Sequence, residues 1–383
     1  PRILHYPIPG NNRGGLLHIY GNNNAKNIIL YCGGYPDGVE PFTPLAQRLA
    51  TSNGSDGNDD DDDDDDVDGC FVGITCWPGF DYESFRQTKF HGFRREGYSF
   101  DEVGCCIREA ASLLFAEYNK ITKENDNNIS NEDCPNKKPQ FTVIFHDFGV
   151  VAGMKFVNRA IEEKYFFEHE PDRIVLLDVL LGPHPKFDRP KEQYNIAPYT
   201  NRENLVYLAY RGRNAYSFVT MRYISEIAGV IAYWFLTGLV RMLRLEPLFD
   251  IDEEVLARRK MSTNHLVYMA YPYYYLFYAL MYDKQALAHA TLPLDLVRMP
   301  ILYIYGTEKN VMFHDHRGLA LLEREEMQGR SDCRVVKVDG AGHWMYCQRP
   351  EVCEREIRKF LRSGKHGLDD EVVHEGDRML SKL

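Results

Sequence analysis

Short apolar runs recur along the chain, and turn residues or longer segments with helical spacing separate them. Apolar runs of about four to eight residues between Gly, Pro and Asn signals predict buried β-strands. The predicted strands are Ile3–Tyr6, Leu16–Tyr20, Asn27–Tyr31, Cys70–Cys76, Phe141–Phe145, Ile174–Leu177, Ile301–Tyr305 and Val335–Val338.

Helical patterns lie between several of these strands. Glu40–Ala50 has helical spacing, and the apolar residues Val103, Ile107 and Ala111 belong to a helix that we expect over about Phe100–Lys120. Strands that alternate with helices predict crossover units, and hence a mostly parallel sheet with helices on both faces. The predicted fold class is therefore α/β.

This alternation stops between residues 183 and 298, where the sequence is helical and rich in Tyr. We predict a helical cap in this span, inserted between two parts of one α/β core, residues 1–182 and 299–362. Three segments are too polar to be buried: the inserts 51–69 and 121–138, and a C-terminal tail over 363–383.

The net charge of −11 comes largely from one run of eight acids, Asp59–Asp66, without which it would be −3. The rest of the chain has no basic excess, so the sequence gives no electrostatic support for binding nucleic acid. Nine cysteines, an odd number, show no paired metal-ligand spacing. They predict reduced thiols in a cytoplasmic protein, for which we expect no metal and no other cofactor.

Two long uncharged stretches raise the question of a membrane. Ile227–Val240 has 14 residues and Leu266–Tyr282 has 17, whereas a spanning helix needs about 20 apolar residues. We therefore expect buried or cap helices in both places. Contact with a membrane surface is the less favoured alternative.

The main chemical signal is a strand, a turn and a helix within residues 141–152. Asp147 directly follows the predicted strand, and Gly149 lets the backbones of the strand and the following helix approach closely. Such a turn holds a reactive side chain at the carboxyl end of a sheet, the usual site position in open α/β folds. The helix N-terminus offers N–H groups to developing negative charge.

This segment resembles the nucleophile elbow of the α/β-hydrolase superfamily. With Asp147 at the nucleophile position, preceded by His146 and followed by an aromatic residue and Gly149, it is most similar to the epoxide hydrolases and haloalkane dehalogenases, whose elbows read Gly-His-Asp-Trp-Gly. Two positions that are usually small in the family hold Phe145 and Val150. The resemblance extends over most of the chain and implies an α/β-hydrolase fold with a cap.

Two further segments resemble motifs of these hydrolases. Residues 33–36, Gly-Gly-Tyr-Pro, are similar to their His-Gly-x-Pro loop, with Gly in place of His. The resemblance implies an oxyanion hole made by the backbone N–H groups of Tyr35 and Phe148. Residues 340–344, Gly-Ala-Gly-His-Trp, are followed by Arg-Pro-Glu and are similar to the catalytic-histidine loop, which implies that His343 is the base.

The acid that orients His343 stays open, because the family places it after either of two strands. After the later strand, Asn310 (or Lys309, depending on the register) stands where the family usually has Asp. Asp178 follows the earlier strand at the place where some haloalkane dehalogenases carry their acid. Glu308 is a third candidate.

The resemblance also bears on the cap, because epoxide hydrolases use two cap Tyr hydroxyls to bind and protonate the epoxide oxygen. Tyr residues are abundant in this span, and we predict that Tyr271, Tyr273 and Tyr274 line the pocket.

These features favour a two-step hydrolase. Asp147 would attack carbon to form an alkyl–enzyme ester, and His343 would activate water to cleave it. The expected partners are a small apolar substrate and water. An epoxide is preferred over an alkyl halide, because dehalogenases hold the halide with the indole of a Trp where this chain has Phe148. A haloalkane dehalogenase-like hydrolase and a non-catalytic binding protein are the alternatives, and the sequence does not predict the oligomeric state.

Overall fold

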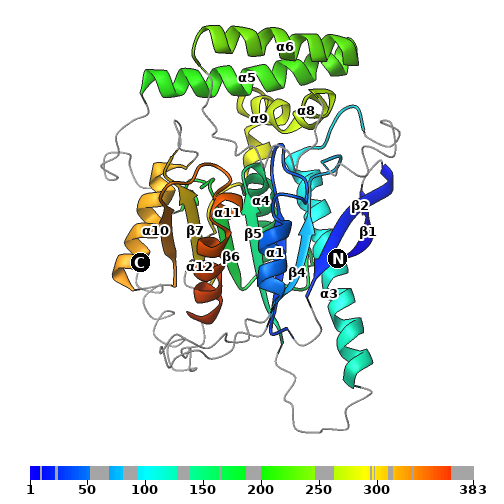
Figure 1. Ribbon diagram of the computed structural model, residues 1–383, viewed down its shortest axis with the longest axis vertical. Coiled ribbons are helices and arrows are strands. Elements are labelled where there is room, and N and C mark those ends of the chain that lie inside the picture. The colour runs from blue at the N-terminus through cyan, green and yellow to red at the C-terminus, as the bar shows by residue number, and fades with distance from the viewer. Residues whose placement is uncertain are drawn as a thin grey trace.

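Eight strands of the described chain form one sheet in the order β1-β2-β4-β3-β5-β6-β7-β8 (Figure 1). β2 pairs antiparallel with both β1 and β4, whereas the later pairs are all parallel. The predicted α/β class with a mostly parallel sheet is therefore confirmed. The strands are β1 (Arg2–Ile8), β2 (Asn11–Tyr20), β3 (Asn27–Cys32), β4 (Phe71–Thr75), β5 (Gln140–His146), β6 (Arg173–Leu177), β7 (Ile301–Gly306) and β8 (Arg334–Val338).

This computed structural model places most of the chain. It describes residues 1–8, 11–21, 25–51, 69–80, 94–126, 138–163, 165–186, 200–245, 263–293, 296, 298–308, 314–329 and 332–363. The residues of β3, β4, β6 and β7 are all buried. Strands that are covered on both faces carry continuous apolar runs instead of alternating ones, which is why the sequence shows such runs here.

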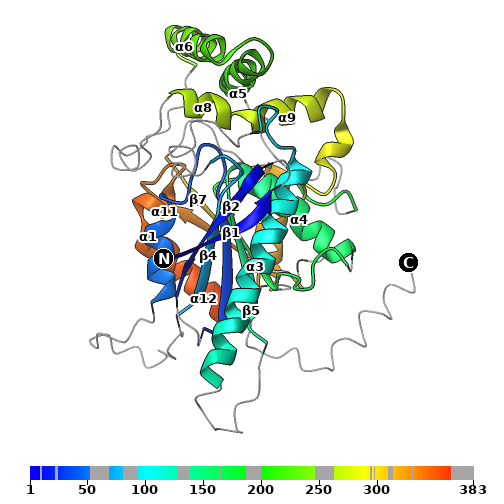
Figure 2. The ribbon, with the colours of Figure 1, turned by 90° about the vertical axis from the view of Figure 1, so that its right-hand side faces the viewer.

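Helices cover both faces of the sheet. α1 packs beside α12, and α3 packs beside α4. Figure 2 shows these two pairs on opposite sides of the strands. The helices of the core are α1 (Thr43–Ala50), α3 (Phe100–Asp126), α4 (Phe148–Glu162), α10 (His316–Gln328), α11 (Met345–Gln348) and α12 (Pro350–Arg362).

A group of helices lies between β6 and β7 in the sequence and over one end of the sheet in space (Figure 1). These helices fall within the predicted cap, residues 183–298. They are α5 (Asn201–Tyr223), α6 (Glu226–Met242), α8 (Thr263–Met269), α9 (Tyr271–Met281) and the 3-10 helix η2 (Lys284–Leu287).

The segment that returns from the cap to the core is tied to α4. The Lys155 ammonium group donates to the carbonyl oxygen of Ala286 at 2.5 Å. The Asn158 amide donates to the carbonyl oxygens of His289 and Thr291 at 2.7 and 3.0 Å. Both side chains are buried, so these hydrogen bonds are shielded from water and fix the return segment to the helix that follows the Asp147 turn.

One predicted boundary is wrong. α3 continues to Asp126, so the first six residues of the predicted polar insert 121–138 are helical. Ile121 packs against the core, and Lys and Glu are good helix formers, so polarity alone did not end the helix. The remainder of that insert from residue 127 to 137, residues 52–68 of the other insert, and the tail beyond Ser363 lie outside the described residues.

A glycine makes room for Phe145, which stands where the resemblance implied a small residue. A Cβ atom at Gly153 on α4 would lie 2.6 Å from the Phe145 ring, well inside van der Waals contact. Phe145 is fully buried at this contact. The bulky ring of Phe145 is therefore accommodated because Gly153 on the neighbouring helix α4 has no side chain.

We expect Gly153→Ala to lower the free energy of unfolding by about 1–3 kcal/mol through overpacking. In a Phe145→Ala background the same substitution should cost little or stabilise, because the ring is gone and Ala favours a helix over Gly. Urea unfolding of the four proteins of this double-mutant cycle measures the coupling. Gly212→Ala is the control, since a Cβ there meets nothing within 4 Å. Equal costs of Gly153→Ala in both backgrounds would contradict the steric interpretation.

Candidate active site

Asp147 occupies a strained position between β5 and α4. Its backbone has φ 51° and ψ −128°, in the region that side-chain-bearing residues rarely adopt. Close backbone contacts hold it there. A Cβ at Gly149 would lie 2.3 Å from the carbonyl oxygen of Cys32, and one at Gly34 would lie 2.4 Å from the backbone nitrogen of Phe148. Only glycine fits at these two positions, and the turn is correspondingly tight.

The Asp147 side chain lines a cavity, and one of its two carboxylate oxygens accepts no hydrogen bond from the described residues. The Phe148 backbone N–H donates to the carboxylate. Oδ2 is buried and accepts no hydrogen bond from the described part of the chain. Burial raises the pKa of Asp147, although the nearby imidazoles of His343 and His146 and the Phe148 N–H pull it down. A carboxylate held out of water without a second partner is a strong nucleophile.

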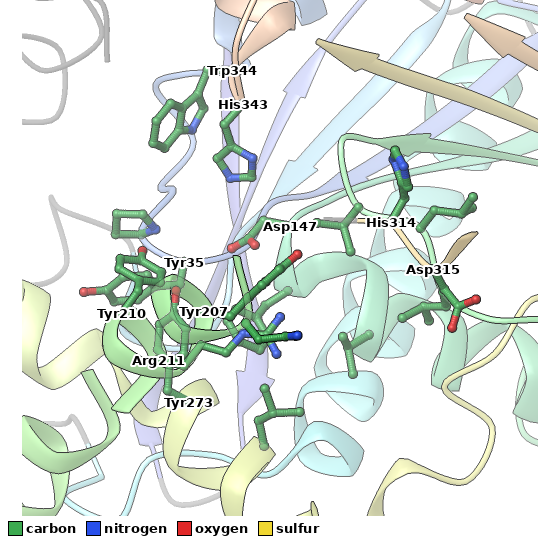
Figure 3. Close-up of a pocket in the computed structure, with 18 residues that line it drawn as sticks. Tyr35, Asp147, Tyr207, Tyr210, Arg211, Tyr273, His314, Asp315, His343 and Trp344 are labelled. Atoms are coloured by element: carbon green, nitrogen blue, oxygen red, sulfur yellow. The ribbon is translucent and has the colours of Figure 1, made fainter. Parts of the chain in front are cut away.

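His343 and Asp178 form a buried pair beside this carboxylate. The Nδ1 atom of His343 is hydrogen bonded to the Asp178 carboxylate, and both side chains are buried. Asp178 directly follows β6 and also has a positive φ, 65°. Figure 3 shows the imidazole of His343 directed toward the Asp147 carboxylate. The bond at Nδ1 fixes the ring orientation and directs Nε2 to the other side of the ring.

Of the other candidates for the orienting acid, the structure describes only Glu308. The Glu308 side chain is exposed, and its backbone N–H donates to the carbonyl oxygen of Ala341 at 2.9 Å. Lys309 and Asn310 lie outside the described residues. Among the described residues, Asp178 is thus the acid that contacts the His343 ring.

A second histidine–carboxylate pair lies next to the first and was not predicted from the sequence. The Nδ1 of His146 is 2.7 Å from Oδ2 of Asp37, and its Nε2 is 3.1 Å from the carbonyl oxygen of His343. Both neighbours are acceptors, so the geometry favours the doubly protonated imidazolium. Burial alone would lower the pKa of His146, but the hydrogen bond to Asp37 and its charge raise it.

Two aromatic donors complete the shell around Asp37. The indole N–H of Trp344 donates to Oδ1 at 3.0 Å, and the Tyr346 hydroxyl donates to Oδ2 at 3.1 Å. These donors come from the segment that follows His343, so Asp37 ties the loop after β3 to the loop that carries His343. The sequence contains only part of this information. Asp37 directly follows the Gly-Gly-Tyr-Pro loop, but nothing in the sequence indicates its hydrogen-bond partners.

The cavity in front of Asp147 has a volume of about 420 Å³ and is lined by residues of both the core and the cap. Tyr35 and Phe148, the predicted oxyanion-hole residues, both line it, as does His343. Two helices of the cap supply the opposite wall: Asn204, Tyr207, Tyr210 and Arg211 come from α5, and Tyr273 and Leu276 come from α9.

Of the three tyrosines predicted to line the pocket, only Tyr273 does so. Tyr271 is fully buried, and its hydroxyl donates to the carbonyl oxygen of Pro78 at 3.0 Å, so it supports the core instead. Tyr274 is not among the residues that line the cavity, and its ring packs near those of Tyr275 and Tyr278. The prediction is wrong for Tyr271 and Tyr274 because α9 turns successive side chains to different sides.

Tyr210 is a further cap tyrosine that lines the cavity beside Tyr273, and the sequence could not identify it. Its ring meets that of Tyr273 edge to face at 5.6 Å, and the two hydroxyls are hydrogen bonded. Burial raises the pKa of Tyr210 to about 12, although the Arg213 guanidinium, 5.1 Å from its ring centroid, opposes the shift. Burial raises the pKa of Tyr273 well above its usual value. Both hydroxyls are therefore protonated donors at neutral pH.

The described residues hold no cluster of His, Cys, Asp and Glu that fits a metal ion. The eight cysteines among them are all free thiols. In the parts of the chain that the structure describes, no helix has the length and apolar character needed to cross a membrane.

Comparison with known proteins identifies the fold. No family model and no curated protein matches the sequence. A haloalkane dehalogenase variant, DbeA-M1, from Bradyrhizobium elkanii is similar in structure with a TM-score of 0.52 and 12% identity, over 94% of this chain and 96% of that one. A putative epoxide hydrolase from Klebsiella pneumoniae has a TM-score of 0.51 and 12% identity, over 94% and 97%. The chain has the predicted α/β-hydrolase fold.

The geometry around His146 predicts a pH-dependent contribution to stability. A His pKa that is raised in the folded state stabilises the fold fully below the unfolded value, 6.5, and this contribution disappears as the pH rises through the folded value. Asp37→Asn should therefore cost more unfolding free energy at about pH 6 than at about pH 9. Urea unfolding at both pH values measures the difference.

Asp172→Asn serves as the matched control. Asp172 accepts a hydrogen bond from the Phe141 backbone N–H at 2.7 Å and is not bonded to a histidine. Its cost should be the same at both pH values. An equal cost for Asp37→Asn at the two pH values would show that His146 is neutral in the folded protein.

Proposed function

We propose that this protein is a hydrolase that opens epoxides through a covalent ester on Asp147. The observation that supports it most directly is the buried Oδ2 of Asp147, which accepts no hydrogen bond from the described residues, in a side chain that lines a cavity next to the His343–Asp178 pair. A carboxylate suits displacement at saturated carbon, because its attack there forms a stable ester. Its attack on an ordinary ester would form an anhydride instead.

In the first step, Oδ2 of Asp147 attacks one carbon of the epoxide and the bond from that carbon to oxygen breaks. The oxygen that leaves needs a proton or a strong hydrogen-bond donor. Tyr210 and Tyr273 supply hydroxyl groups on the opposite wall of the cavity. Tyr210 is the better proton donor, because the hydrogen bond from Tyr273 and the charge of Arg213 both stabilise its anion.

In the second step, the neutral imidazole of His343 takes a proton from water, and the resulting hydroxide attacks the carbonyl carbon of the Asp147 ester. Asp178 stabilises the imidazolium that forms, as a buried carboxylate on the far ring nitrogen does in hydrolytic triads. We assign the oxyanion to the backbone N–H groups of Phe148 and Tyr35. Collapse releases the diol and restores the Asp147 carboxylate, and the proton on His343 returns to the Tyr210 anion, so that all three groups regain their starting states.

The cavity favours an epoxide over an alkyl halide. A departing halide needs an N–H donor near the nucleophile, and Phe148 offers only a phenyl ring on that side. The two tyrosine hydroxyls are suited to an oxygen that gains negative charge. A non-catalytic binding protein would have no use for a buried carboxylate with one oxygen that accepts no hydrogen bond from the described residues, because its desolvation is costly.

We expect His343→Gln to trap the covalent ester. Intact mass spectrometry after exposure to an aryl epoxide should show a mass gain equal to the whole epoxide, because ring opening loses no atoms. An alkyl halide would instead add the alkyl group minus one hydrogen. Asp147→Ala/His343→Gln is the control and should gain no mass. Failure of the single variant to gain mass from either class of compound would refute a covalent mechanism on Asp147.

The choice of Tyr210 as proton donor can be tested in the same variant. Adding Tyr210→Phe to His343→Gln should slow formation of the ester from an epoxide by about 10²-fold or more, as expected for loss of a general acid. Tyr274→Phe is the matched control, since this residue lies on the same helix as Tyr273 but outside the cavity. Rapid-quench mass spectrometry gives the rates. A similar rate with and without Tyr210→Phe would assign the proton to another donor.

A further inference from the structure

The exposed face of α6 is apolar, the reverse of what a surface helix normally shows. Ile227, Ile231, Trp234, Phe235 and Met242 have exposed fractions between 57% and 73%. Their spacing of four, three, one and seven residues places them on one side of the helix. We call this stripe the α6 face. A helix on the surface of a globular protein normally turns such a stripe toward the core.

The opposite side of α6 explains why the apolar stripe faces outward. Its buried residues are Gly229, Thr237 and Val240, and small residues of this kind let two helices approach closely. A Cβ at Gly229 would lie 2.5 Å from Cβ of Met221 on α5, so a larger residue does not fit. The close packing of Gly229 on α5 thus fixes the rotation of α6 about its axis and keeps the apolar stripe exposed.

The α6 face lies at the end of the molecule farthest from the sheet. Figures 1 and 2 both show α6 as the outermost helix, and it packs on α5 and α8. The turn that joins the two helices is apolar as well, since Tyr223 and Ile224 are 64% and 70% exposed. The stripe is therefore a protruding surface and is not the wall of a groove.

The charge of this hairpin is opposite to that of the whole chain. Residues 200–245 contain six Arg and two Glu, without Lys or Asp, for a net charge of +4, whereas the chain as a whole has −11. Arg241 and Arg244 are exposed at the end of α6 beside Met242. Arginines at the edge of an apolar helical stripe are the arrangement by which interfacial helices bind anionic lipid headgroups.

We propose that the α6 face docks the protein onto the surface of a bilayer that contains anionic phospholipid. The helix lies in the plane of the interface, with the apolar stripe below the headgroups and the arginines among them. Trp234 fits this position, because indole is favoured at the boundary of headgroups and acyl chains. A two-fold contact with a second copy of the chain would bury the same stripe on both sides, but it would offer the arginines no layer of phosphate groups.

Trp234 itself provides the measurement. Trp77 and Trp344 are 1% and 3% exposed, whereas Trp234 is 57% exposed, so a change of solvent environment is reported by Trp234. On addition of phosphatidylcholine vesicles that contain a minority of phosphatidylserine, the emission should shift to the blue, and brominated acyl chains should quench it. Vesicles of phosphatidylcholine alone should bind less, and salt should weaken binding to the mixed vesicles.

Variants separate the two contributions. Ile227→Asn/Ile231→Asn keeps Trp234 and should abolish the blue shift and cosedimentation with mixed vesicles. Met327→Asn is the matched control, because Met327 is 81% exposed but lies on α10 of the core; it should bind as the unaltered protein does. Arg241→Gln and Arg244→Gln should each lower the partition coefficient about fivefold, as expected for one basic residue at an anionic surface.

The outcomes that overturn the proposal are distinct from these. Absence of quenching by brominated lipid in the unaltered protein would exclude docking through this face, and it needs no variant to fold. Equal loss of binding in Met327→Asn would show that the contact is not specific to α6. A blue shift that appears without lipid on raising the protein concentration, with a dimer in sedimentation velocity, would assign the face to a second copy. Ester formation on Asp147 is measured without vesicles, so its result does not affect this test.

Discussion

The candidate site depends on the close approach of three backbone segments around Asp147. Gly34 and Gly149 allow the loop after β3 and the start of α4 to lie against the turn, and this packing holds Asp147 in a backbone conformation that costs free energy. The carboxylate is thereby fixed at the carboxyl end of β5 beneath the cap. The adjacent loops of β6 and β8 bring Asp178 and His343 to the same edge, because neighbouring parallel strands end there.

Two histidine–carboxylate pairs share this small volume and differ in what surrounds them. The Asp37 carboxylate takes hydrogen bonds from His146, Trp344 and Tyr346, and it is not among the residues that line the cavity in front of Asp147. Asp178 holds only one ring nitrogen of His343 and leaves the other side of that ring toward the cavity. The first pair joins two loops, whereas the second places an imidazole beside the cavity. The two imidazole rings lie 4.5 Å apart, so the first pair also supports the second.

The sequence predicted the sheet well, because its buried strands are continuous apolar runs with turn residues at both ends. The turn at Asp147 and the His343 loop were identifiable because short motifs carry them. Asp37 and Tyr210 were not, since their roles depend on partners more than 50 residues away in the chain. The sequence also did not show which side of α6 is exposed. Residues 227–240 are uncharged, so no charged side indicates which face is buried. The close contact at Gly229 decides it.

The tie between α4 and the return segment of the cap has a mechanical consequence. Lys155 and Asn158 hold three backbone carbonyls of that segment with buried hydrogen bonds, and they stand on the same rigid helix that begins next to Asp147. A cap that is fastened on this side cannot lift away as a whole. Any movement of the cap that admits a substrate therefore has to be a rotation about this hydrogen-bonded segment. The largest displacement would then occur in α5 and α6.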